Sequence, residues 1–189
     1  MNLSNSQLCS EGFRQIIGSL SVSIESLDLS NNKAIEKACY KQFGEHILEV
    51  EKYQKLSSLS LEGNMIGDDT LDVLLNSLKY NLGVTFLNLS QNNITELGAK
   101  TIKHFLSSNN TIRVLFLHWN KLGLQGSKRI AKSLITNSVL QVLDLSFCQL
   151  GTHKKPSARP KPQKSEDSPV DQKGKSKKKK EPKAPAAKE

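Results

Sequence analysis

The sequence predicts an α/β solenoid, with parallel strands on its concave face and helices on its convex face, followed by a disordered C-terminal tail. A nine-residue pattern of alternating apolar residues recurs between residues 24 and 148, as expected of short strands. The segments between these copies carry apolar residues at helical spacing. All six prolines lie after residue 155, so the repeats and the tail differ in composition as well as in pattern.

The strand pattern occurs in five copies. Four of them open 28 residues apart: LSSLSLEGN (56–64), VTFLNLSQN (84–92), IRVLFLHWN (112–120) and LQVLDLSFC (140–148). The first copy, IESLDLSNN (24–32), opens 32 residues before the second, so its unit contains a four-residue insertion. The leucines alternate in each copy, as Leu59 and Leu61 do, which puts them on one face of a strand.

The segments that follow the strands are predicted to be helices. Leu71, Leu75 and Leu78 lie on one helical face together with Leu74, and Asp68 and Asp69 are placed to cap the start of this helix. The same spacing recurs at Ala99, Ile102 and Leu106 and at Ile130 and Leu134. A helix-like fragment, CSEGFRQIIGSL, precedes the first strand at 9–20. No helical pattern follows the fifth strand, so the last repeat is predicted to be uncapped, as in a fragment, an isoform or a docking edge.

These features resemble the leucine-rich repeat, whose pattern is LxxLxLxxN/C followed by a connecting segment. The 28-residue period with a helical second half is similar to the ribonuclease-inhibitor-type subfamily. We expect an N-terminal helical cap or partial repeat at 1–23, a repeat domain at 24–152 and a tail at 153–189. The repeats of this domain start at residues 24, 56, 84, 112 and 140. The resemblance implies a fold and a binding role, but no particular partner.

A column of asparagines ends the copies of the pattern. Asn32, Asn64, Asn92 and Asn120 occupy the ninth position, and Cys148 takes this position in the last copy. An asparagine amide both donates and accepts hydrogen bonds, so these side chains are expected to satisfy backbone groups and form a structural ladder between repeats. Cys148 is interpreted as a buried structural thiol of the same column.

The fourth and fifth copies bring aromatic residues to the predicted concave face. Alternation along the strands turns Phe116, Trp119 and Phe147 outward, and Trp119 is the only tryptophan of the chain. Aromatic residues and arginine carry much of the binding energy of protein interfaces. The predicted partner-binding patch comprises Phe86, Arg113, Phe116, His118, Trp119, Asp144 and Phe147. The alternatives are that these rings pack on one another or that missing structure covers them.

We expect no catalytic site, metal or cofactor. His118 is flanked by Ser90 and Ser146, and with Asp144 this makes a Ser/His/Asp set by residue type. A serine nucleophile also needs a strained backbone and free amide donors for an oxyanion, whereas strand amides are used in the sheet. The chain also has no CxxC pair among its three cysteines and no complete phosphate-binding loop.

The tail is predicted to be disordered and basic. Residues 153–189 hold 13 basic and 5 acidic residues (net +8), whereas residues 1–152 hold 14 and 13 (net +1). A compact basic cluster comprises Lys175, Lys177, Lys178, Lys179 and Lys180. Such a cluster can serve as a nuclear-localisation signal, can attract an acidic surface (tubulin, nucleic acid or anionic lipid), or can simply keep the chain in solution.

The sequence as a whole predicts a non-catalytic scaffold that binds a partner protein on its concave face, with the tail aiding localisation or electrostatic contact. Similarity in repeat type to Ran GTPase-activating proteins keeps GTPase activation as an alternative, although those proteins have longer arrays and an acidic tail. A tail-driven polyanion or nucleic-acid binder is the other alternative. The cysteine usage and the lack of a signal-like N-terminus predict an intracellular, cytoplasmic protein, with cytoskeletal, ciliary or nuclear association left open.

Overall fold

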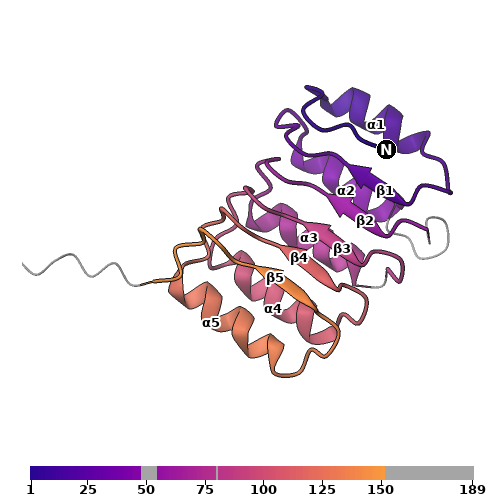
Figure 1. Ribbon diagram of the computed structural model, residues 1–189. Helices are drawn as coiled ribbons and strands as arrows, with labels where there is room; N and C mark the ends of the chain where they lie inside the picture. Colours follow the sequence, from indigo (N-terminus) through magenta and orange to yellow (C-terminus); the bar gives the residue numbers. More distant parts are fainter. Residues whose placement is uncertain (48–54, 80, 152–189) are drawn as a thin grey trace, which may run out of the picture. The chain divides into compact units, whose positions relative to one another are not determined.

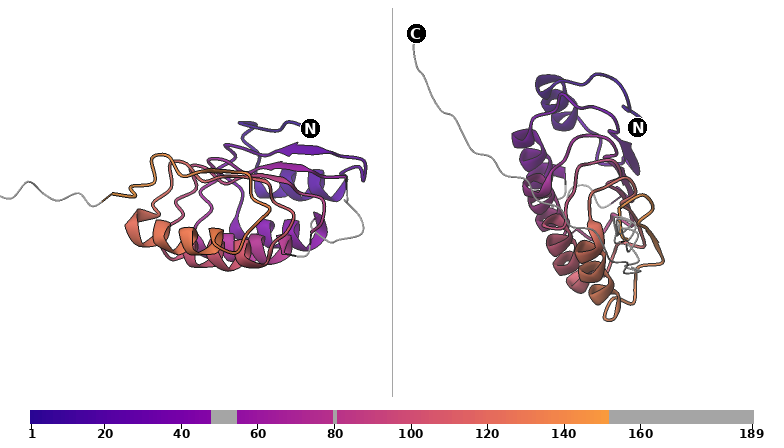
Figure 2. Two further views of the ribbon diagram at one scale, coloured as in Figure 1. Left: turned by 60° about the horizontal axis from the view of Figure 1, so that its bottom comes forward. Right: turned by 90° about the vertical axis from the view of Figure 1, so that its left-hand side faces the viewer.

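The described residues form two layers, a parallel sheet and a row of helices on one of its faces (Figures 1 and 2). The computed structural model describes residues 1–47, 55–79 and 81–151. The strands are β1 (Ser26–Asp28), β2 (Ser58–Ser60), β3 (Phe86–Asn88), β4 (Val114–Phe116) and β5 (Val142–Asp144). The helices are α1 (Ser10–Gly18), α2 (Lys37–Ile47), α3 (Asp68–Leu78), α4 (Gly98–Ser108) and α5 (Gly123–Leu134).

The chain divides into two units, Met1–His153 and Lys154–Glu189. The first unit contains all the helices and strands given above. The second unit, with the predicted basic cluster of the tail, lies outside the described residues. The fold and the candidate site are therefore those of the first unit.

The strands follow one another in the order β1-β2-β3-β4-β5, and each pair is parallel. Every strand begins two residues after its repeat opens, so the 28-residue period sets the register, as in the pair Leu59 and Leu87. Leu27 still pairs with Leu59 across the 32-residue first unit, so the insertion is accommodated between the strands. A strand–helix–strand connection repeated in this way builds a solenoid.

The core lies between the two layers. Leu59, Leu61, Leu87 and Leu89 point from the sheet toward the helices and are fully buried. The helical side of the core includes Leu71, Leu74, Leu75, Leu78, Ala99, Ile102, Leu106 and Ile130. Each layer has one apolar face, and stacking the repeats removes both faces from water. The predicted α/β solenoid is confirmed.

The N-terminal segment extends both layers beyond β1. Phe13 of α1 packs against Tyr40 and Phe43 of α2, with ring centroids 5.8 and 5.9 Å apart. The backbone of Leu3 donates a hydrogen bond to the carbonyl of Asp28, and a bridge joins residues 2 and 28. The first 23 residues therefore supply a helix and a short strand-like segment to the edge of the sheet.

Asp68 does not cap its own helix. α3 has Gly67 at its N-cap and receives no side-chain cap, so the predicted capping role of Asp68 and Asp69 is wrong. The Asp68 carboxylate instead accepts hydrogen bonds from the next repeat: from Thr95 N (2.8 Å), Thr95 Oγ1 (2.6 Å) and Gly98 N (3.0 Å). The reason is that stacking of the repeats brings the start of α4 beside the start of α3. This contact cannot be inferred from the residues next to Asp68 in the sequence.

We expect Asp68→Ala to lower the free energy of unfolding by about 2 kcal/mol, because three donors of the next repeat lose a charged acceptor. Urea unfolding followed by circular dichroism measures this change. Asp68→Asn keeps one acceptor oxygen in place and is expected to lose less. A loss below about 0.5 kcal/mol in Asp68→Ala would mean that these bonds add nothing beyond what water supplies to the same groups.

The C-terminal end of the repeat unit is less well covered than the middle. Leu134 was predicted to belong to the buried face of its helix, but its side chain is 40% exposed. Leu140, Leu143 and Leu145 of the last repeat are only partly buried, in contrast to their counterparts in the preceding repeats. The reason is geometric: among the described residues, no further repeat stacks on α5 and β5.

Candidate functional site

The asparagine column runs through the buried turns that follow the strands. Asn92 Oδ1 accepts hydrogen bonds from the backbone N–H groups of Asn64 (2.9 Å) and Ile66 (3.1 Å). Its Nδ2 donates to the carbonyls of Leu61 (2.8 Å) and Ser90 (3.0 Å). The same arrangement recurs at Asn32, Asn64 and Asn120. Each amide therefore ties one repeat to the next and leaves no outward group for a ligand.

Cys148 occupies the asparagine position of the last repeat. Its Sγ donates a hydrogen bond to the Leu117 carbonyl (3.0 Å), and the residue is almost fully buried. Burial raises the pKa of this thiol, so the reactive thiolate form is disfavoured at neutral pH. The geometry is that of a structural side chain.

The turn before the asparagine column has a left-handed backbone in every repeat. The eighth position is Asn31, Gly63, Gln91, Trp119 and Phe147 in successive repeats, and its φ lies between 56° and 67°. This conformation suits glycine and asparagine, whereas bulky side chains rarely adopt it. The backbone conformation of the turn therefore does not explain why tryptophan and phenylalanine occupy this position.

Trp119 and Phe147 form a stacked pair on the surface. Their ring centroids lie 4.4 Å apart with planes 10° from parallel, yet the side chains are 58% and 67% exposed. Because both residues follow their strands, the left-handed turn and not strand alternation directs them outward. They do pack on one another, as one of the alternatives held, and they still leave a large apolar surface in contact with water.

The other aromatic residues of the predicted patch lie on the sheet itself. Phe86 and Phe116 meet edge to face with centroids 5.3 Å apart, and Phe116 lies 6.3 Å from the His118 ring. Arg113 precedes β4 whereas Trp119 follows it, so these two residues lie at opposite ends of the strand. The structure thus divides the predicted patch into a half-buried cluster on the sheet, an exposed pair in the turns and a separate arginine.

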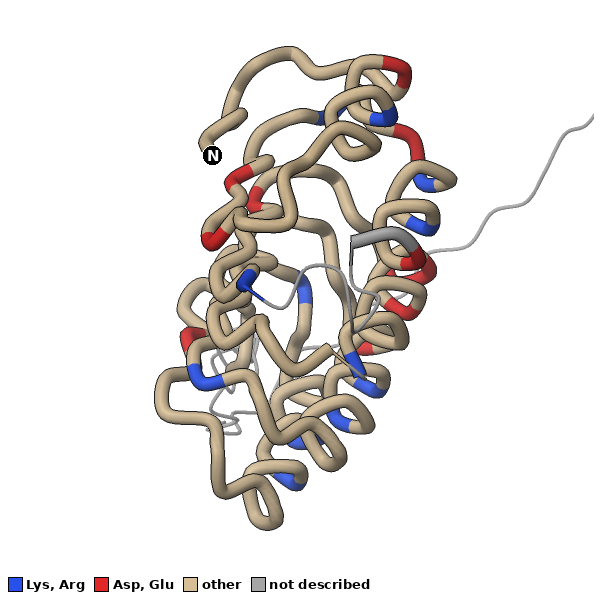
Figure 3. Tube along the Cα trace, turned by 90° about the vertical axis from the view of Figure 1, so that its right-hand side faces the viewer, with Lys and Arg blue, Asp and Glu red and all other residues tan. Residues whose placement is uncertain are grey.

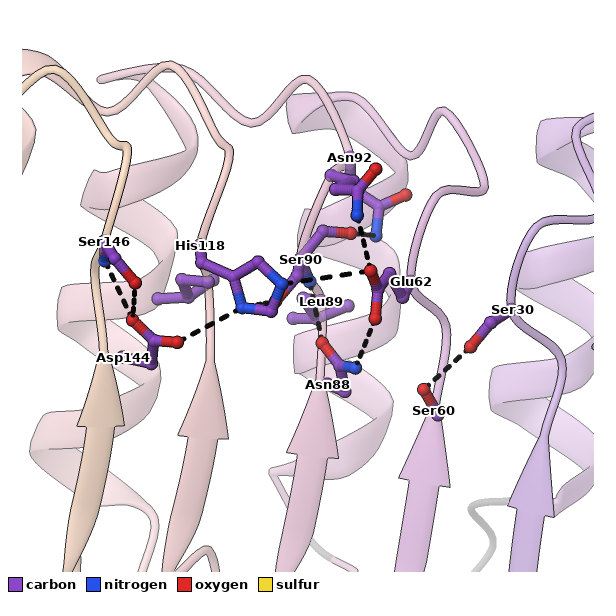
Figure 4. A network of polar contacts seen from close by, with 12 residues as sticks. Ser30, Ser60, Glu62, Asn88, Leu89, Ser90, Asn92, His118, Asp144 and Ser146 are labelled. Carbon is purple, nitrogen blue, oxygen red and sulfur yellow. Dashed lines mark hydrogen bonds and ion pairs between the residues drawn. The ribbon is translucent and has the colours of Figure 1, made fainter.

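A polar network crosses the carboxyl ends of β2 to β5 and centres on His118 (Figure 4). Its Nδ1 lies 2.8 Å from Ser90 Oγ and 3.2 Å from Asp144 Oδ2. Its Nε2 lies 3.8 Å from Glu62 Oε1. The Glu62 carboxylate also accepts a hydrogen bond from Asn88 (3.0 Å).

Glu62, Asn88 and Ser90 are network members that the predicted patch leaves out. Glu62, Ser90 and His118 share the seventh position of three successive repeats, and Asn88 holds the fifth position of the same repeat as Ser90. Register at 28-residue spacing makes equivalent positions lateral neighbours. That spacing is the signal from which this part of the network can be found.

The network does not have the geometry of a nucleophilic triad. In such a triad the serine and the carboxylate contact opposite ring nitrogens of the histidine. Here Ser90 and Asp144 approach the same atom, Nδ1 of His118. Ser146, the other serine, donates its hydroxyl and its backbone N–H to Asp144 instead. This arrangement positions side chains on the sheet and does not prepare a serine for attack.

Hydrogen bonds from the Ser146 hydroxyl and backbone, with a smaller contribution from His118, lower the pKa of Asp144. A lowered folded-state pKa means that Asp144 stabilises the fold while it is ionised, and that this stabilisation is lost as the pH falls below about 4. We expect the urea midpoint of the wild type to fall more between pH 6 and pH 3 than that of Asp144→Asn. Equal falls in both proteins would show that Asp144 contributes nothing to the acid sensitivity.

Among the described residues, no group of three or more His, Cys, Asp or Glu side chains is arranged to hold a metal ion. None of the described helices combines the length and the apolar character needed to cross a bilayer. The strand face with its turn residues is the candidate for function that the network and the aromatic stack define.

The fold and the repeated turns define the class of protein. Residues 81–103 and 136–152 match the family model described as Leucine Rich repeat. Over these residues the chain matches the leucine-rich repeat, and its fold is that of a leucine-rich-repeat solenoid. Its assignment to the ribonuclease-inhibitor-type subfamily stays a prediction.

Two of the solved structures that match the chain share this fold. One is described as leiomodin-1 actin-binding site 2 (TM-score 0.61, 24% identity, 72% of this chain and 78% of that chain). The other is the tropomodulin C-terminal domain of Caenorhabditis elegans (TM-score 0.60, 18% identity, 73% of this chain and 83% of that chain). None of the curated protein sequences compared with the chain matches it. At these identities the likeness concerns the fold alone.

Proposed function

We propose that this leucine-rich-repeat protein is a non-catalytic interaction scaffold that binds a partner protein on its strand face. The observation that carries the proposal is the exposed Trp119–Phe147 stack in a turn that other repeats fill with Asn, Gly or Gln. A bulky residue in the left-handed region destabilises the turn by about 1 kcal/mol or more. Residues kept in such conformations are typical of functional sites.

The chemistry of the surroundings supports the same role. A binding surface gains from rigid aromatic residues beside polar groups that fix the orientation of a partner. Phe116 and His118 belong to the same repeat as Trp119 and their rings lie 6.3 Å apart, and His118 is held by Asp144 and Ser90. The pair and the network are therefore pre-ordered, which reduces the entropy lost when a partner binds.

Within this proposal the two parts of the chain have separate roles. Residues 1–23 and the repeat domain at 24–152 form the binding surface, and the tail at 153–189 aids localisation through its charge. Leiomodin-1 actin-binding site 2 shares the fold of the repeat domain. Actin is therefore the first purified protein to test, and the proposal itself extends to any protein partner of the strand face.

The experiment compares proteins retained by the wild type, by Trp119→Ala and by Leu97→Ala in quantitative affinity purification, with direct titration of actin. Leu97→Ala is the matched control, because Leu97 is 69% exposed but lies at the start of α4. We expect a partner that wild type and Leu97→Ala retain and Trp119→Ala loses. Equal retention by all three chains would show that the stack is not the binding surface.

A further inference from the structure

The helix layer carries its charge unevenly. The helices α4 and α5 contain five basic residues and no acidic residue: Lys100, Lys103, Lys128, Arg129 and Lys132. The helices α1 to α3 contain three basic and five acidic residues. Figure 3 shows the Lys and Arg positions gathered on the helices at the end of the repeat unit farthest from the N-terminus. Residues 1–152 have a net charge of only +1, but the helices α4 and α5 nevertheless form a basic surface.

The lysines of this surface are not neutralised by neighbours. On α2, Lys37 and Lys41 each lie 3.9 Å from a carboxylate, of Asp69 and Glu45 respectively. On α5, Arg129 is paired with Glu96 at 3.5 Å. In contrast, the lysines of α4 and α5 have no ion pair within the described part of the chain. Four positive charges are thus left to face solvent.

These charges share an outer surface with an exposed apolar side chain. Helical spacing places Lys128, Lys132 and Ile135 on the side of α5 opposite the buried Ile130. Ile135 is 83% exposed and lies directly after α5. Lys100 is likewise exposed on α4, which packs beside α5. We define the helix-layer basic surface as Lys100, Lys103, Lys128, Lys132 and Ile135.

We propose that the helix-layer basic surface docks on an anionic lipid bilayer. Each lysine near such a bilayer raises affinity by about fivefold, and an exposed isoleucine at its edge can enter the interfacial region. The surface belongs to the outer helix layer and exposes no Phe, Tyr or Trp on α4 or α5, so the base stacking used for single-stranded nucleic acid is lacking. An isoleucine beside lysines favours lipid over a phosphate backbone, which offers no apolar region at its charged surface.

The proposal is independent of the strand-face function. Trp119 and Phe147 lie in the turns that follow β4 and β5, whereas the helix-layer basic surface belongs to the row of helices, which lies on one face of the sheet (Figure 2). A chain held on a bilayer through its helices would still present its strand face to a partner. Stable attachment to a membrane generally needs two weak signals, and the tail, with its net charge of +8, is available as the second.

The test uses the full chain and measures its partition onto phosphatidylcholine vesicles with and without phosphatidylserine. Lys128→Glu/Lys132→Glu is expected to lower partition onto the anionic vesicles roughly tenfold or more. Lys37→Glu/Lys41→Glu on α2 makes the same change in net charge and is expected to lower partition less than about threefold, because α2 lies more than a Debye length from α5. Equal losses in the two variants would show that binding is not oriented and would overturn the proposal.

Two further measurements test the apolar contact and the orientation of the chain on the bilayer. Ile135→Asp is expected to weaken partition onto the anionic vesicles without disrupting any of the ion pairs described above. Far-ultraviolet circular dichroism checks that each variant is folded. Trp119 is the only tryptophan, so brominated lipids should leave the fluorescence nearly unquenched if the helix layer faces the bilayer. Strong quenching, or unchanged partition of Lys128→Glu/Lys132→Glu, would contradict the proposal. A loss of affinity for duplex DNA with vesicle binding retained would assign the surface to nucleic acid instead.

Discussion

Replacing Asn92 by leucine is expected to lower the free energy of unfolding by about 4 kcal/mol. The Asn92 side chain is fully buried and makes four hydrogen bonds to backbone groups. Leucine has a similar volume but leaves those donors and acceptors without partners, and each buried unsatisfied group destabilises the fold by about 1–3 kcal/mol. Since the Ser90 carbonyl also accepts a hydrogen bond from the Gly63 N–H, the total is expected at the lower end of the sum.

Urea unfolding of the purified chain measures this effect, with Asn110→Leu as the matched control. Asn110 is an exposed loop residue, so the same chemical change there is expected to alter stability by less than about 0.5 kcal/mol. Because stability in a solenoid depends on the contacts between neighbouring repeats, Asn92→Leu is also expected to reduce cooperativity and the slope of the transition. A loss below about 1 kcal/mol would mean that water or a rearranged turn satisfies the exposed groups.

Removing the Trp119 side chain is expected to weaken partner binding by roughly 30-fold, or about 2 kcal/mol. Phe147→Ala is expected to approach this value, because the Trp119 ring is held by a stacked neighbour whose centroid is 4.4 Å away. The double substitution should then cause less than the sum of the two losses, since each single change already disrupts the pair. Titration of the identified partner with all four proteins measures the coupling.

The left-handed turn allows stability and binding to be separated. Trp119→Gly removes the same ring as Trp119→Ala but relieves the backbone at a φ of 57°. We expect both variants to bind equally weakly, and Trp119→Gly to be the more stable by about 1 kcal/mol. If restoring stability in this way also restored affinity, the loss in Trp119→Ala would be due to misfolding and the stack would have no direct role.

Much of this architecture follows from periodicity alone. Alternating leucines such as Leu59 and Leu61, and the helical spacing of Leu71, Leu74 and Leu78, specify which face of each element is buried. A period of 28 residues then brings equivalent positions side by side, so the repeated solenoid can be predicted without any distance. The prediction was less accurate where one repeat acts on another, as with Asp68 and the start of α4.

The candidate site was predicted by residue type and assembled only by the fold. The sequence identified Trp119, Phe147 and His118 as unusual among equivalent positions, because comparing repeats reveals a departure from the column. It did not show that the first two stack in a left-handed turn, or that Ser90 and Asp144 meet the same nitrogen of His118. Those contacts depend on backbone angles and on side-chain rotamers across neighbouring strands.

The sequence by itself determined the repeat, its strand and helix faces and the buried asparagine column, because each of these depends on spacing within a short stretch of chain. Tertiary structure decided which side chains meet between repeats and how charge is distributed over the two layers. Lys100 and Lys128, for example, belong to different repeats and share a surface only because α4 packs beside α5. The physical reason is that stacking converts distances along the chain into lateral contacts, and those contacts assemble both the strand face and the basic surface.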